Sequence, residues 1–71
     1  MSIDINVVCG ALKDSESNLS VRGICQWLGL DPTSETLNEI RNACEEAIEA
    51  SVLFAMDVPT NDSTTRFYWL V

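Results

Sequence analysis

Carboxylates are the groups in this sequence whose number and spacing could do chemistry. The segment TSETLNEIRNACEEAIEA, residues 33–50, has a single base, Arg41, and these acids: Glu35, Glu39, Glu45, Glu46 and Glu49. Two carboxylates serve as acid and base when their environments separate their pKa values. Glu45 and Glu46 point in different directions on a helix. Glu45 and Glu49 share one side of it, but that side is exposed, so no burial would separate their pKa values. The pattern predicts a charged surface instead of a catalytic pair.

Other reactive groups are sparse. The chain has no histidine, and no GxSxG motif or phosphate-binding glycine loop appears in it. Its cysteines, at positions 9, 25 and 44, are odd in number and form no CxxC pair. Each falls on an apolar stripe, so we expect buried reduced thiols that pack as small hydrophobic groups. We therefore expect no enzyme, no cofactor and no metal site.

The charge balance bears on the partners. There are 11 acids and 4 bases, for a net charge of −7. DNA affinity comes largely from lysine and arginine on phosphates, and the bases here are few and scattered: Lys13, Arg22, Arg41 and Arg66. A field of this sign repels nucleic acid and attracts basic surfaces. Direct nucleic-acid binding is therefore not favoured, and a protein partner with a basic surface is.

Length and hydropathy indicate one small domain over residues 1–71. The hydrophobic fraction is 46%, which is typical of a folded chain, and no apolar run approaches the about 20 residues that cross a bilayer. The first residues, MSIDINVV, lack the basic region of a secretory signal. We expect a cytoplasmic protein, or one of the host cytoplasm if a phage encodes it.

Residues 2–13 fit two structures. The stripe that predicts a helix, at i, i+3, i+4 and i+7, consists of Ile5, Val8, Cys9 and Leu12. The alternation of β-branched residues that favours a strand consists of Ile3, Ile5 and Val7. We prefer the helix, because the stripe extends to Leu12, Ser2 is suited to cap its start and Lys13 suits its end.

Two more helices follow a polar loop at residues 14–18 and a very short strand at Leu19. Ser20 is placed to cap the first of them and Gly29 to stop it in a left-handed conformation. Gly23 inside this helix predicts close approach of a neighbouring helix. The second begins at Thr33 or Ser34 after a turn at residues 31–32, and its apolar face consists of Leu37, Ile40, Cys44, Ala47 and Ile48.

The last part changes period. The segments VLFAMDV and TRFYWLV are rich in strand-forming residues and flank the turn-forming segment PTNDST. They predict a β-hairpin with a polar tip. Phe67 and Trp69 fall on one of its faces, and Tyr68 and Leu70 fall on the other.

This α+β order, three helices followed by a C-terminal hairpin, resembles the winged helix-turn-helix superfamily. The resemblance covers essentially the whole chain and rests on LSVRGICQWLGL, DPT, SETLNEIRNACEEAIEA and PTNDST as first helix, turn, second helix and wing tip. It implies that the second motif helix would enter the DNA major groove. Five glutamates on that helix oppose DNA binding, because their negative charges repel the negatively charged phosphates.

We therefore expect a non-enzymatic winged-helix protein that binds another protein, with an acidic helix that binds or mimics DNA towards a nucleic-acid-binding partner. Small acidic domains of this sort occur among phage and mobile-element inhibitors of host machinery. The expected contact residues are Glu35, Glu39, Asn42, Glu45, Glu46, Glu49, Trp27 and Tyr68. One alternative is a DNA-binding regulator that uses Arg22, Arg41, Asn42 and Arg66. Another is a structural subunit of a larger complex.

Self-association is a secondary expectation. The terminal strand, FYWLV, is expected to lie at a sheet edge, where a second chain can pair with it. The first helix is the other surface that we expect to support a homodimer.

Overall fold

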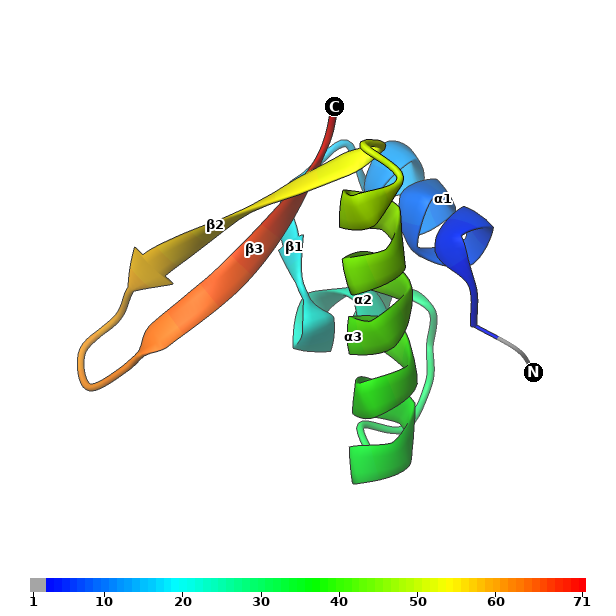
Figure 1. Cartoon of the computed structure of the whole chain (residues 1–71). Helices are drawn as coiled ribbons and strands as arrows, with labels where there is room; N and C mark the ends of the chain where they lie inside the picture. Colours follow the sequence, from blue (N-terminus) through cyan, green and yellow to red (C-terminus); the bar gives the residue numbers. More distant parts are fainter. Residues whose placement is uncertain (1–2) are drawn as a thin grey trace.

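The structure is a computed structural model that describes residues 3–71 (Figure 1). Its elements follow the order α1 (Ile5–Ser15), β1 (Leu19–Ser20), α2 (Val21–Trp27), α3 (Ser34–Glu49), β2 (Leu53–Pro59) and β3 (Thr64–Leu70). The predicted α+β class and the order of three helices before a hairpin are confirmed. The hairpin of β2 and β3 projects away from the helices.

The first segment is helical, not extended. The side chain of Asp4 caps α1 by accepting a hydrogen bond of 3.1 Å from the backbone N–H of Val7. The predicted cap, Ser2, lies outside the described residues. α1 continues to Ser15, inside the segment expected to be a loop, and ends where Glu16 adopts a left-handed φ of 54°.

The segment from α2 to α3 follows the predicted boundaries closely. The side chain of Ser20 accepts from the N–H of Gly23, and that of Thr33 accepts from the N–H of Thr36. Gly29 has a φ of 72°, as a glycine that ends a helix should. The prediction that a neighbouring helix closely approaches Gly23 is wrong. A Cβ at this position would meet the side chain of Leu19 in β1 at 3.4 Å, an ordinary contact.

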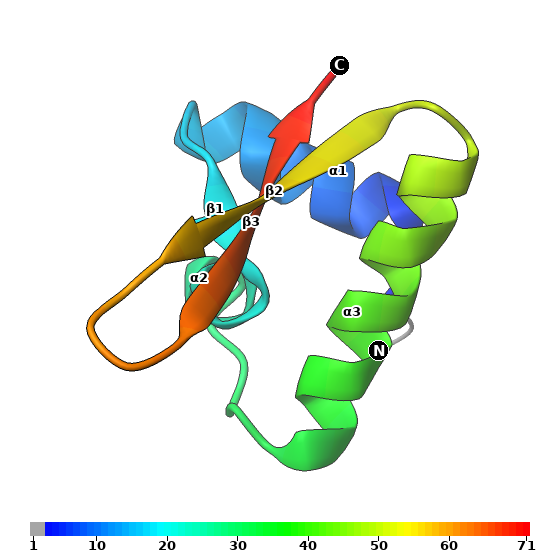
Figure 2. The same cartoon turned by 60° about the vertical axis from the view of Figure 1, so that its left-hand side comes forward.

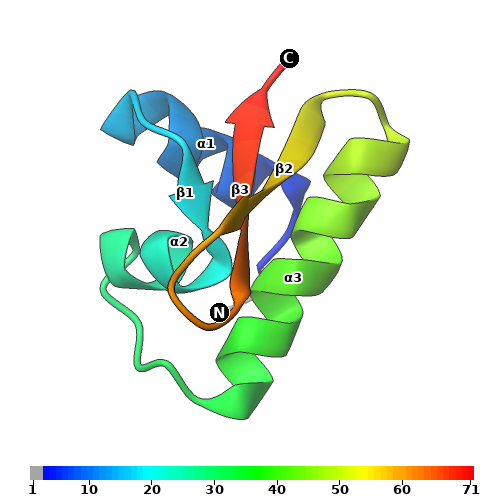
Figure 3. The same ribbon diagram turned by 90° about the vertical axis from the view of Figure 1, so that its left-hand side faces the viewer.

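The three strands form one antiparallel sheet in the order β1-β3-β2 (Figure 3). Tyr68 of β3 lies opposite Leu19 of β1 on one side and opposite Ala55 of β2 on the other. The prediction that the terminal strand lies at the edge is therefore wrong. The short strand β1 pairs with β3 on the side away from β2, so β1 and β2 are the edge strands among the described residues.

The core lies between the helices and the inner face of the sheet. In Figure 2, α1 crosses behind the sheet and α3 stands to one side of it, and both helices contact strands of the hairpin. The buried residues come from all three helices and both hairpin strands: Val8, Ala11, Leu12, Ile24, Cys25, Ile40, Ala43, Cys44, Ala47, Leu53 and Tyr68. Cys25 and Cys44 are buried, as predicted, whereas Cys9 is only half-buried; all three thiols are free. No helix within residues 3–71 has the length and apolarity to cross a membrane.

Candidate interaction surfaces

The exposed side of α3 carries a line of four glutamates and one asparagine, which we call the acidic stripe. The spacing of its members alternates between four and three residues, which keeps them on one side of a helix. All are exposed: Glu35, Glu39, Asn42, Glu46 and Glu49. None of these glutamates forms an ion pair with a residue in the described range 3–71. The stripe is a one-signed surface about 21 Å long, at 1.5 Å of rise per residue.

Glu45 was predicted to belong with the other glutamates, but it lies at the border of the acidic stripe, on the side of α3 that reaches the hairpin. Its carboxylate is 3.5 Å from the guanidinium of Arg66 on β3, and that guanidinium also binds Asp57 of β2 at 2.9 Å. The hydrogen bond from Arg66 lowers the pKa of Asp57. Glu45 therefore links α3 to the hairpin and is partly neutralised, unlike the stripe.

The two aromatic contact residues expected from the sequence have different surroundings. Trp27, the last residue of α2, is 52% exposed and remains available to a partner. Tyr68 is only 1% exposed, because its side of β3 faces the helices. Its assignment as a contact residue is therefore a mistake, and burial raises the pKa of its hydroxyl.

The face of the hairpin that points away from the helices is apolar and open, and we call it the outer sheet face. Residues that alternate along each strand share a face, and the register pairs Phe54 with Trp69 and Met56 with Phe67. The rings of Phe54 and Trp69 stack with centroids 5.5 Å apart. Phe54 is 45% and Met56 53% exposed. Large apolar groups gathered on one open face are typical of a contact surface.

The sequence expectations missed this surface. Both faces of β2 are apolar, with Leu53 and Ala55 on one side and Phe54 and Met56 on the other. Alternation shows that these residues form two sets, but it does not show which set the helices cover. The signal in the sequence that could have indicated this surface was the placement of Phe67 and Trp69 on the same face of the predicted strand.

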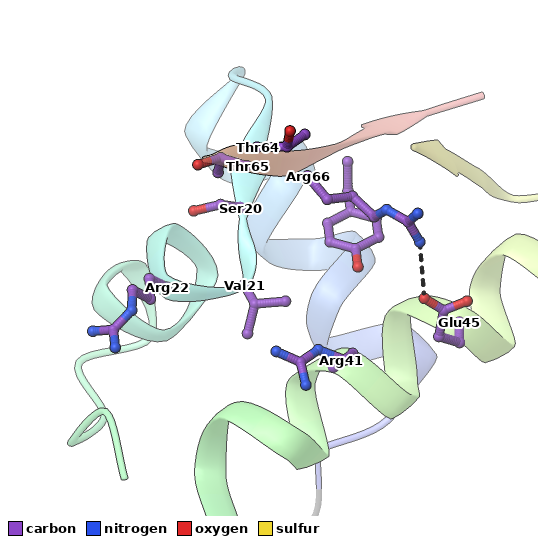
Figure 4. Close-up of a pocket in the computed structure, with 9 residues that line it drawn as sticks. Ser20, Val21, Arg22, Arg41, Glu45, Thr64, Thr65 and Arg66 are labelled. Atoms are coloured by element: carbon purple, nitrogen blue, oxygen red, sulfur yellow. Dashed lines mark hydrogen bonds and ion pairs between the residues drawn. The ribbon is translucent and has the colours of Figure 1, made fainter. Parts of the chain in front are cut away.

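A hollow lies between α2, α3 and β3 (Figure 4). Three of the chain's four bases line it, namely Arg22, Arg41 and Arg66, together with the side chains of Ser20, Thr64 and Thr65. It has a volume of about 420 Å³. The expectation that the bases are scattered therefore holds for the sequence but not for the fold. Arg66 points across the hollow to Glu45 and is already paired.

The described residues bring no three carboxylate, thiol or imidazole groups together at a point where a metal ion could bind. Cys44 lies in the core, where burial raises the pKa of its thiol to about 12. A thiol in that state is a packing group and a poor nucleophile.

Comparisons with protein-family models, with curated proteins and with solved structures found no match to this chain.

Proposed function

We propose that this chain is a winged-helix domain that binds a protein and catalyses no reaction. In this proposal the acidic stripe of α3 contacts a partner whose surface is basic and ordinarily binds nucleic acid. In its narrower form, the protein is a phage or mobile-element inhibitor that offers carboxylates where its partner binds phosphates. The order of α2, turn, α3 and projecting hairpin supports the winged-helix assignment.

The acidic stripe is the observation that carries the proposal. Its glutamates are exposed and have no cationic partner among residues 3–71. Solubility is served by mixed charges, and a long one-signed surface exceeds that need. Such a surface raises the association rate with an oppositely charged partner.

Charge reversal tests this role directly. A variant with Glu39→Lys, Glu46→Lys and Glu49→Lys would be compared with the wild type as bait in a lysate of the native host. We expect the wild type to retain a nucleic-acid-binding protein that duplex DNA displaces, and the variant to lose it. A matched control with Asp14→Lys, Glu16→Lys and Asp62→Lys changes the net charge equally but leaves α3 intact. Equal retention by both variants and the wild type would exclude the stripe as the contact surface.

The hollow between α2, α3 and β3 favours a second candidate, a DNA-binding regulator. Arg22, Arg41 and Arg66 are gathered there, and arginines on phosphates supply DNA affinity. Glu45 and Asp57 offset part of that charge through Arg66. A gel-shift assay on random duplex DNA at low salt separates the candidates. The first predicts no shift at micromolar protein, and the second predicts a shift that weakens steeply with salt and is lost in Arg41→Gln.

The outer sheet face favours the third role, a structural subunit of a larger assembly. Its exposed rings would be held by apolar contact, which salt does not weaken. Retention of a partner by the charge-reversed variant, combined with its loss on Met56→Lys, would assign the contact to this face.

A further inference from the structure

Strand β2 presents an unpaired edge. It pairs only with β3, and within residues 3–71 no strand lies on its other side. The N–H of Val71 bonds to the carbonyl of Val52 at 3.2 Å. Hydrogen-bonded and non-bonded pairs alternate along an antiparallel ladder, so Phe54, Met56 and Val58 direct their backbone groups towards β3. The N–H and C=O groups of Leu53, Ala55 and Asp57 therefore point away from β3. Leu53 is only 2% exposed, so the open part of this edge lies at Ala55 and Asp57.

This edge lacks the features that normally prevent pairing. Natural edge strands carry lysines, prolines or bulges. β2 has no lysine, its register with β3 is continuous, and its proline is the final residue, Pro59. Its one charged residue, Asp57, is bound to Arg66 of the neighbouring strand at 2.9 Å. Figure 1 shows the hairpin extending away from the helices, with β2 lying above β3 in that view.

We propose that β2 pairs with β2 of a second copy, antiparallel, about a twofold axis through Ala55. In this register Ala55 lies opposite its own copy and Leu53 lies opposite Asp57. The N–H and C=O of Ala55 then bond to the C=O and N–H of Ala55 in the second chain. Asp57 of each chain faces Leu53 of the other, and because Leu53 is only 2% exposed, these outer pairs form only when the cover over Leu53 shifts. Pro59, which has no N–H to donate, lies beyond the paired segment.

The side chains fit a second copy in this register. Phe54 lies opposite Met56 of the other chain at a non-hydrogen-bonded pair, where side chains are closest. The two outer sheet faces then join into one apolar surface. The two Asp57 carboxylates lie at opposite ends of the paired segment, whereas an axis through Asp57 would place like charges face to face.

The charge of the chain gives this contact a distinctive salt dependence. Each copy carries a net charge of −7, so two copies repel each other at long range, and salt screens that repulsion. Added salt strengthens the dimer. A contact between the acidic stripe and a basic partner weakens under the same change, so the two interactions are separable in one titration.

Sedimentation equilibrium tests the dimer. We expect a mass that rises with concentration from 7.9 kDa to twice that value, and a tighter dimer at higher salt. In Met56→Lys the dissociation constant should rise about tenfold or more, because an ammonium would face apolar side chains. Gln26→Lys adds the same charge at an exposed position of α2 and should leave association unchanged. A wild type that stays monomeric at millimolar concentration, or a dimer that Met56→Lys does not weaken, would overturn the proposal.

Cross-linking tests the register. In a Cys9→Ser background, Ala55→Cys should form an intermolecular disulfide on mild oxidation. Its Cα would lie about 5.5 Å from the same atom of the copy, within the about 4.4–6.8 Å that a disulfide spans. Asn61→Cys at the exposed tip is the control and should cross-link far less. Equal yields at the two positions would contradict an axis at Ala55, and circular dichroism would verify that both variants are folded.

Discussion

Helix α3 and the hairpin of β2 and β3 both bury one side in the same core, yet their open sides have opposite chemistry. The open side of α3 is a line of carboxylates, and that of the hairpin is a set of aromatic and aliphatic side chains. Water solvates carboxylates readily, so the acidic stripe is stable without a partner. Exposed rings gain free energy when they are covered.

The difference assigns different tasks to the two surfaces. Charge acts over roughly 10 Å at 0.1 M salt and governs the approach of a partner. Apolar contact acts only on touching and governs how long a complex lasts. Our proposals follow this division: the stripe is directed to a basic partner, and the edge and outer face of the hairpin are directed to a second copy.

The largest expected change in stability distinguishes the inner side of β3 from its outer side. Tyr68→Ala removes a ring that is 1% exposed and should cost about 3–5 kcal/mol of unfolding free energy. Trp69→Ala, one residue along, removes a half-buried side chain and should cost about 1–2 kcal/mol. Urea denaturation at one fixed protein concentration measures both. Equal losses would mean that the two sides of the strand are not distinct.

An alkaline titration examines the inner side of α3. The folded Cys44 thiol keeps its proton to about pH 12, while an unfolded thiol loses it near its ordinary value. The unfolded state therefore binds fewer protons in that window, and stability should fall by about 1.4 kcal/mol per pH unit from this thiol. Urea midpoints should therefore decline as the pH rises from about 9, the ordinary value for a thiol, towards about 12, the folded value for Cys44. The decline should be shallower in Cys44→Ala, and an unchanged slope would contradict the burial of this thiol.

The smallest effects lie on the outer side of α3. Glu39→Lys places a cation four residues after Glu35 and should add about 0.2–0.5 kcal/mol of stability. Glu45→Gln removes an exposed ion pair with Arg66 and should cost no more than about 1 kcal/mol. Thermal unfolding at low and high salt measures both changes, which salt should reduce. A loss of several kcal/mol in either variant would show that this side is part of the core.

Much of the local structure was predictable because it depends on neighbours in the chain. The caps at Ser20 and Thr33 and the left-handed Gly29 need only a few adjacent residues to form. The apolar stripes of the helices and the hairpin follow from their periods of 3.6 and 2 residues. The acidic stripe belongs to this group, since the spacing of its glutamates fixes it on one side of α3.

Tertiary structure decided which side of each element is covered and which strands are neighbours. β1 has only two residues, Leu19 and Ser20, too few to carry a periodic signal, yet it makes β3 central and leaves the β2 edge free. The same packing turns Tyr68 inward. It also brings Arg66 within reach of Glu45, 21 positions away in the chain. Sequence period defines the two faces of an element, but only contact with the rest of the molecule determines which face is buried.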